Sequence, residues 1–175
     1  MDFEIAQGVK DLLISMLEKS DTGYLGAIPE LGESLPAFMK DRWNWSVDKD
    51  HIFTATDVGV GMVEMARMIV QPGDSIVVNG PVYHNFFNWI NELKCTTVDA
   101  PMKKVGMHYT LDLEAIENAY RNGAKIHFLC NPQNPTGTVH TREELSAIAD
   151  LAKKYGVFVF SDEIHAPLTY DFKSF

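Results

Sequence analysis

Polar side chains that could do chemistry gather directly after four apolar stretches of the sequence. These four segments are rich in glycine and proline and contain an aspartate, an asparagine, a histidine and a tyrosine; they span residues 56–61, 79–83, 131–137 and 161–165. In an open parallel sheet, ligands bind beyond the carboxyl ends of the strands. We therefore expect one shared site that offers a carboxylate, an amide, an imidazole and a phenol.

The type and neighbourhood of each polar residue leave more than one interpretation. Asp162 follows the apolar run 157–160 and should be partly buried. A buried carboxylate is costly unless a cation pairs with it, so Asp162 indicates a cationic ligand, a salt bridge or a helix cap. Asn134 lies in a loop stiffened by two Asn-Pro pairs, which would hold its amide in place. Taken alone, His165 is more typical of a structural histidine, and Tyr83 of a core or rim aromatic.

The glycine pair in residues 59–61 invites a comparison with dinucleotide-binding loops. The third glycine of that pattern is replaced by Glu64, and the next strand ends in Asn79 instead of an acid. These departures argue against a nicotinamide dinucleotide. A helix that begins at small residues still favours a single phosphate, through free N–H groups and the helix dipole. The alternative is that glycine is needed there for close packing.

The order of apolar patterns predicts an α/β fold, with three α/β/α layers around a mostly parallel sheet. Short β-rich runs alternate with amphipathic helical patterns. The expected strands cover residues 51–55, 75–79, 95–98, 126–130 and 157–160. The expected helices cover residues 5–17, 29–43, 62–69, 85–93, 112–123 and 141–155. The run 157–160 is apolar on both faces, which predicts a strand covered by helices on both sides.

Composition excludes several classes of partner. The net charge of −9 and the pI of about 5.0 argue against nucleic acid or an anionic membrane surface as the partner. Apolar stretches are too short to span a bilayer, and no signal-peptide pattern opens the chain. Cys95 and Cys130 have neither a zinc spacing nor a disulfide framework. We expect a cytoplasmic protein with two reduced thiols and no metal site.

Several motifs together resemble a known enzyme family. The run NPQNPTG at 131–137, followed by a capped helix and then SDEIH at 161–165, is similar to the fold-type I pyridoxal 5′-phosphate (PLP) enzymes of the aminotransferase class I/II superfamily. The DEIH ending and the PVYHNF segment at 81–86 resemble the MalY/PatB-type cystathionine β-lyase (C–S lyase) branch. This resemblance covers nearly the whole chain. It implies a helical lead-in over 1–45 and part of the PLP-binding large domain over 46–175.

The resemblance implies roles for the residues that would surround the ring of PLP. Asp162 would pair with the pyridine nitrogen and keep it protonated. Asn134 would donate to the phenolic oxygen, and His165 could reach the same oxygen. Tyr83 would stack on the ring face.

Three further positions follow from the resemblance. Val58 and Gly59 would give backbone N–H groups to the phosphate, and Tyr24 would line the substrate pocket, which could be that of a neighbouring subunit. Asp57 stands where many relatives carry a small residue. An acid beside a phosphate is unfavourable unless its side chain turns away, for example to cap the helix.

The family's catalytic lysine has no counterpart in this sequence. Relatives hold PLP as a Schiff base on a lysine in a serine-x-x-lysine context, whereas the last lysine here, Lys173, lies eight residues beyond His165 without that context. We therefore expect a fragment with no catalytic residue of its own, weak cofactor binding and negligible turnover.

The resemblance implies a function for the complete enzyme and leaves two alternatives. The expected reaction is cleavage of cystathionine or a cysteine-type substrate to a thiol, pyruvate and ammonia, in a homodimer. An aminotransferase would share every motif named above and is the first alternative. A non-catalytic interaction module is the second.

Overall fold

The chain divides into two compact units, which meet in sequence between Ile52 and Phe53. The computed structural model describes residues 3–24 and 29–170. The first unit contains helix α1 (Gln7–Glu18), helix α2 (Pro29–Trp43) and the short 3-10 helix η1 (Lys49–His51). The sequence predicts both α-helices. The division of function at residue 45, between a lead-in and a cofactor-binding domain, stays a prediction.

The strand predicted over residues 51–55 is wrong. Its start is taken up by η1, because the side chain of Asp48 accepts a hydrogen bond from the backbone N–H of Asp50 at 3.0 Å and closes a local turn. The rest of the segment is irregular, and Phe53 is exposed. An apolar run that buries little surface has no reason to join a sheet.

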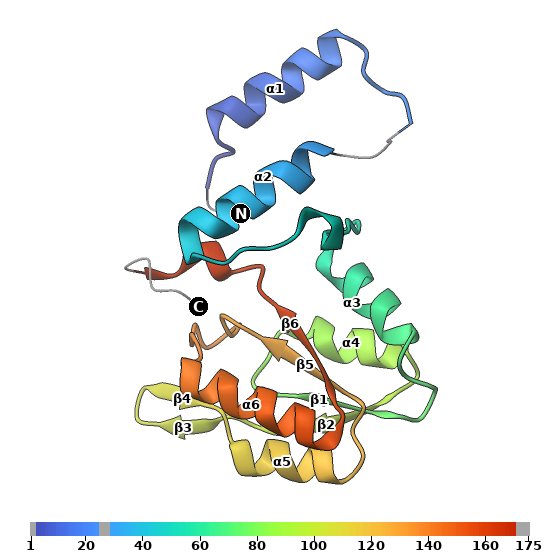
Figure 1. Cartoon of the computed structure of the whole chain (residues 1–175), viewed down its shortest axis with the longest axis vertical. Helices are drawn as coiled ribbons and strands as arrows, with labels where there is room; N and C mark the ends of the chain where they lie inside the picture. Colours follow the sequence, from blue (N-terminus) through green and yellow to red (C-terminus); the bar gives the residue numbers. More distant parts are fainter. Residues whose placement is uncertain (1–2, 25–28, 171–175) are drawn as a thin grey trace. The chain divides into compact units, whose positions relative to one another are not determined.

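A four-stranded parallel sheet forms the centre of the second unit (Figure 1). Its strands are β1 (Ser75–Val78), β2 (Thr96–Asp99), β5 (Ile126–Cys130) and β6 (Phe158–Asp162), in the spatial order β2-β1-β5-β6. In the register of the last pair, Cys130 lies opposite Asp162. A small antiparallel hairpin, β3 (Lys103–Val105) and β4 (His108–Thr110), was not predicted from the sequence.

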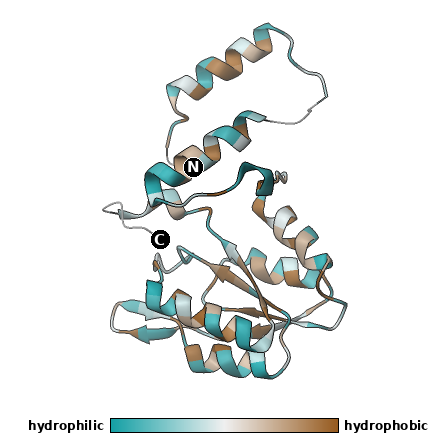
Figure 2. Cartoon of the chain, in the orientation of Figure 1, coloured by the Kyte–Doolittle hydropathy of each residue, from teal (hydrophilic) through white to brown (hydrophobic). Residues whose placement is uncertain are grey.

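Helices cover both faces of this sheet, as the sequence predicts. Their bounds are α3 (Val58–Arg67), α4 (Asn85–Glu92), α5 (Leu113–Arg121), α6 (Arg142–Tyr155) and the 3-10 helix η2 (Ala166–Leu168). In β1, Ile76 and Val78 pack in the cluster with α3 and α4, whereas Val77 packs in the cluster with α5 and α6. This alternation follows from the two-residue period of a strand and gives three layers. Figure 2 shows β1 and β5 coloured mostly hydrophobic, while the helices carry both colours.

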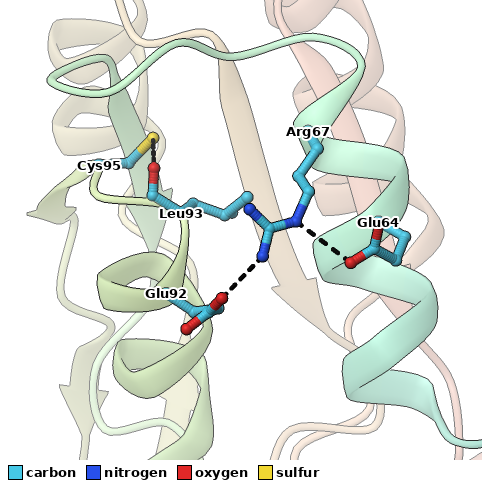
Figure 3. A network of polar contacts seen from close by, with 5 residues as sticks. All are labelled: Glu64, Arg67, Glu92, Leu93 and Cys95. Carbon is cyan, nitrogen blue, oxygen red and sulfur yellow. Dashed lines mark hydrogen bonds and ion pairs between the residues drawn. The ribbon is translucent and has the colours of Figure 1, made fainter.

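An arginine links helices α3 and α4, which cover the same face of the sheet (Figure 3). Arg67 at the end of α3 contacts Glu64 at 3.1 Å on its own helix and Glu92 at 2.7 Å on α4. Both glutamates raise the pKa of the Arg67 guanidinium. All three side chains are exposed, so this bridge adds little to stability.

The last strand, β6, is less covered than its sequence predicts. Among the described residues it pairs only with β5, so it forms one edge of the sheet. Phe158 is 55% exposed, while Val159 and Phe160 are half-buried. The sequence predicts helices over both faces of this strand, and this prediction is only partly met. An edge strand has a neighbouring strand on one side only, so the layer of helices extends less far over it.

The helix ends confirm the local signals in the sequence. Thr141 and Glu144 form a reciprocal capping box at the start of α6, and Gly156 ends that helix with a left-handed φ of 70°. The side chain of Asp112 caps α5. In the described part of the chain, no helix is both long and apolar enough to cross a membrane.

Candidate functional site

Three loops meet at the carboxyl edge of the sheet, after β1, β5 and β6. The loop after β5 is bonded to both of the others. The side-chain amide of Gln133 donates to the carbonyl oxygens of Asn79 and Pro81 at 2.9 and 2.8 Å. The backbone N–H of Asn131 donates to the carbonyl oxygen of Asp162 at 3.0 Å. The segment 56–61 does not follow a strand, but it leads into α3, which covers the same sheet.

A cavity of about 270 Å³ opens beside the loop after β5. It is lined by Pro132, Gln133, Asn134, Pro135, Gly137, Val139, His165, Leu168, Thr169 and Tyr170. The structure thus brings together two of the predicted site residues, Asn134 and His165. The cavity is close to the lower end of the range for small-molecule sites, about 300–1,000 Å³. The other predicted residues do not line it and are described in turn.

Asp162 ends β6 and is 7% exposed. One carboxylate oxygen accepts a hydrogen bond from the backbone N–H of Ile164 at 3.2 Å. Among the described residues it forms no ion pair, and it caps no helix. Within the described part of the chain neither a salt bridge nor a helix cap accounts for its burial, and the pairing with a cationic ligand stays a prediction.

The backbone of Asn134 is held by the strand that precedes it. Its N–H donates to the sulfur of Cys130 at 3.4 Å, and Cys130 is also the register partner of Asp162. Burial raises the pKa of the Cys130 thiol to about 11, and the charge of Asp162 adds to this effect. The thiol is therefore protonated at neutral pH and does not suit the role of a nucleophile.

Tyr83 is half-buried in the loop after β1. Its hydroxyl oxygen accepts a hydrogen bond from the side-chain amide of Asn85 at 2.7 Å. Its ring makes edge contacts with His84 and Trp89, with centroids 4.7 and 6.4 Å apart. These contacts hold the ring in one orientation, and the stacking role implied for it stays a prediction.

The start of α3 supports both interpretations of the glycine pair. A Cβ atom on Gly59 would lie 2.5 Å from the indole nitrogen of Trp89, so close packing alone requires glycine there. The side chain of Asp57 turns away to cap the helix, accepting from the N–H of Val60 at 2.9 Å. The N–H groups of Val58 and Gly59 have no acceptor within the helix, because they belong to its first turn. Anion binding by these two groups stays a prediction, and Gly59 is buried.

Two other residues named from the sequence are Tyr24, whose role stays a prediction, and Lys173, the last lysine. Tyr24 belongs to the first unit and is fully exposed. Lys173 lies in residues 171–175, outside the described residues.

Sequence reasoning missed a row of buried, hydrogen-bonded polar side chains that ends at Asn79, in the loop after β1. His127 on β5 is fully buried and lies 2.6 Å from both the hydroxyl of Tyr120 and the side-chain oxygen of Asn79. Burial lowers the pKa of His127 to about 3, so its ring is neutral. The available signal was a lone histidine in an otherwise apolar strand.

A second buried histidine also escaped notice. Both ring nitrogens of His140 are buried without a hydrogen-bond partner, and so is the side-chain oxygen of Gln133. Burial lowers the pKa of His140.

Comparison with known proteins identifies the family. Residues 7–175 match the aminotransferase class I and II family. The chain belongs to this family. The fold agrees, because the chain superimposes on the PLP-bound C–S lyase of Staphylococcus hominis with a TM-score of 0.95, at 25% identity, over 99% of this chain and 45% of that one.

Relatives of known sequence in the class I and II family include both lyases and aminotransferases. A Mycobacterium leprae protein whose name proposes a cystathionine β-lyase is 37% identical over 96% of this chain and 43% of its own length. An aspartate aminotransferase of Sulfolobus acidocaldarius is 27% identical over 98% of this chain and 44% of its own length. The chain thus spans less than half the length of these curated relatives.

Proposed function

We propose that this chain forms part of the PLP site of a carbon–sulfur β-lyase. The observation that carries the proposal is the carboxylate of Asp162, which is buried at the edge of the sheet without a cation among the described residues. Asp162 is the last residue of β6 and pairs in register with Cys130, the last residue of β5, while Asn134 and His165 in the loops after these two strands line the cavity. A protonated pyridine nitrogen is a cation that suits such a carboxylate, and the amide and imidazole suit the oxygens of the ring.

In this proposal the residues at the carboxyl edge hold and polarise the cofactor. Asp162 stabilises a proton on the ring nitrogen, since a nearby negative charge favours the protonated form. Asn134 and His165 donate hydrogen bonds to the phenolic oxygen. PLP, when bound, withdraws electrons from the α-carbon of an amino acid substrate.

The phosphate and the ring face are assigned to the other predicted residues. The free N–H groups of Val58 and Gly59 bind the phosphate at the start of α3, where the helix dipole favours an anion. Tyr83 covers the ring. Asp57 is compatible with this arrangement because its side chain is occupied by the N–H of Val60.

The lyase assignment rests on relatives. The names of the M. leprae and S. hominis proteins support a C–S lyase that acts on cystathionine or cysteine-type substrates and releases a thiol, pyruvate and ammonia. The S. acidocaldarius relative supports an aminotransferase as the second candidate. Product analysis of the complete enzyme separates them, because only the aminotransferase yields an aminated acceptor. The proposal includes a cytoplasmic homodimer for that enzyme.

We propose that the chain as given is inactive. Among the described residues no lysine lines the cavity, so the amine that would anchor PLP covalently and serve as the family's base is missing there. We expect PLP to bind reversibly, and borohydride to leave no cofactor attached.

Titration with PLP tests the proposal directly. D162N removes the charge while its side-chain oxygen can still accept from Ile164, and D150N, an exposed acid on α6, is the matched control. We expect saturable PLP binding by the wild type and by D150N, with at least tenfold weaker binding by D162N. Equal affinity in D162N, or no saturable binding by the wild type, would refute the proposal.

A further inference from the structure

We infer that Gln133 is a positioning residue that clamps the loop carrying Asn134 to the loop carrying Tyr83. The positioning role rests on the proposed function, in which Asn134 bonds to the phenolic oxygen of the cofactor and Tyr83 covers its ring face. Gln133 directly precedes Asn134 in the sequence, and its bonding partner Pro81 lies two residues before Tyr83.

The hydrogen bonds fix the orientation of the Gln133 amide. Its nitrogen lies 2.9 Å from the carbonyl oxygen of Asn79 and 2.8 Å from that of Pro81. A carbonyl can only accept, so the amide must present its two N–H groups to these oxygens. Its own oxygen is then left buried and without a partner. The side chain is 2% exposed, so water does not compete for these bonds.

Both ends of the clamp are themselves held. The backbone N–H of Gln133 donates to the carbonyl oxygen of Thr138 at 2.7 Å, and its carbonyl oxygen accepts from the N–H of Gly137 at 2.8 Å. On the other side, the side chain of Asn79 bonds to His127 at 2.6 Å and to the carbonyl oxygen of Ala100 at 3.1 Å. Because both loops are held in this way, we expect a displacement of one loop to displace the other through the two hydrogen bonds of the Gln133 amide.

A side chain that only filled space would not need these N–H groups. Methionine has nearly the same length and volume as glutamine and no donor, so Q133M separates packing from clamping. Q133E provides a second variant of equal length that also lacks the N–H groups. The matched control is T136V, because the side chain of Thr136 bonds only within its own loop, to Thr138 at 2.9 Å.

Hydrogen exchange of the whole chain, read separately over residues 79–87 and 131–140, tests the clamp without the cofactor. In Q133M and Q133E we expect exchange to become at least tenfold faster in both segments. In T136V we expect faster exchange in 131–140 alone. If neither Q133M nor Q133E accelerates exchange in 79–87, the clamp does not exist.

Titration of the same variants with PLP tests the positioning role. We expect binding to weaken at least tenfold in Q133M and less than threefold in T136V. Loosened loops with unchanged PLP affinity in Q133M would refute the positioning role while leaving the proposed function intact. A wild type that fails to bind PLP would instead refute the proposed function, and the exchange data would still decide on the clamp.

Discussion

Replacement of the buried Gly59 by alanine has two opposing effects on stability: a steric clash that destabilises the fold and a higher helix propensity that stabilises it. The added Cβ atom would lie 2.5–2.9 Å from three atoms of the Trp89 indole, closer than real Cβ contacts allow. Overpacking of a well-packed core costs about 1–3 kcal/mol. Alanine recovers about 0.5–1 kcal/mol relative to glycine inside a helix. The difference is about 0–2.5 kcal/mol, so we expect G59A to lower the free energy of unfolding by about 1–2 kcal/mol near the middle of that range.

Thermal or urea unfolding followed by circular dichroism measures this difference. A loss of that size lowers the melting temperature by roughly 3–10 °C in a domain of this size. G61A in the same helix is the control, because its Cβ would meet the Cβ of Ala55 at an ordinary 3.5 Å. We expect G61A to be as stable as the wild type or up to about 1 kcal/mol more stable. If G59A is no less stable than G61A, the contact with Trp89 does not explain the glycine.

Three further predictions concern caps and pH. D57A removes the acceptor for the N–H of Val60 and should destabilise the chain by about 1 kcal/mol in urea unfolding, while strengthening any binding of phosphate at α3; unchanged stability would contradict the cap. T141A breaks the reciprocal box with Glu144 and should also cost about 1 kcal/mol, measured in the same way. His127 has its pKa lowered from 6.5 to about 3, so below pH 6.5 the unfolded chain binds a proton that the folded chain refuses. Stability is therefore full above pH 6.5 and should fall by about 2 kcal/mol between pH 6.5 and 5.0, a slope that H127Q should flatten.

Local signals in the sequence predict the helix ends and the central strands well. The capping box at Thr141 and Glu144, the cap at Asp112 and the glycine stop at Gly156 all depend on neighbours within a few residues. The strand 126–130 is apolar except for His127 and is buried on both faces, so its pattern predicts a central strand.

Features that depend on distant partners could not be predicted. The strand order decides that β6 lies at an edge and that Phe158 is exposed, and no local pattern records that order. The hairpin of β3 and β4 is short, polar and exposed, so it lacks the alternation by which strands are recognised.

The candidate site shows the same division. Motifs led to Asn134 and His165, which line one cavity, and to Asp162, which is buried at the end of β6 and does not line that cavity. Gln133 was overlooked although it stands inside the motif, because its role depends on two carbonyl oxygens more than fifty residues away.

The row of buried polar side chains that ends at Asn79 also determines where one proton resides. The carbonyl oxygen of Ala100 can only accept, so the nitrogen of the Asn79 side chain faces it and the oxygen faces His127. The ring of His127 must then carry its hydrogen on Nε2, which leaves Nδ1 bare and obliges the hydroxyl of Tyr120 to donate. The main-chain carbonyl of Ala100 thereby selects the tautomer of His127 and the direction of the Tyr120 hydroxyl on α5. In Y120F, Nδ1 of His127 would be buried without a hydrogen-bond donor, while the bonds from His127 to Asn79 and from Asn79 to Ala100 would keep their direction.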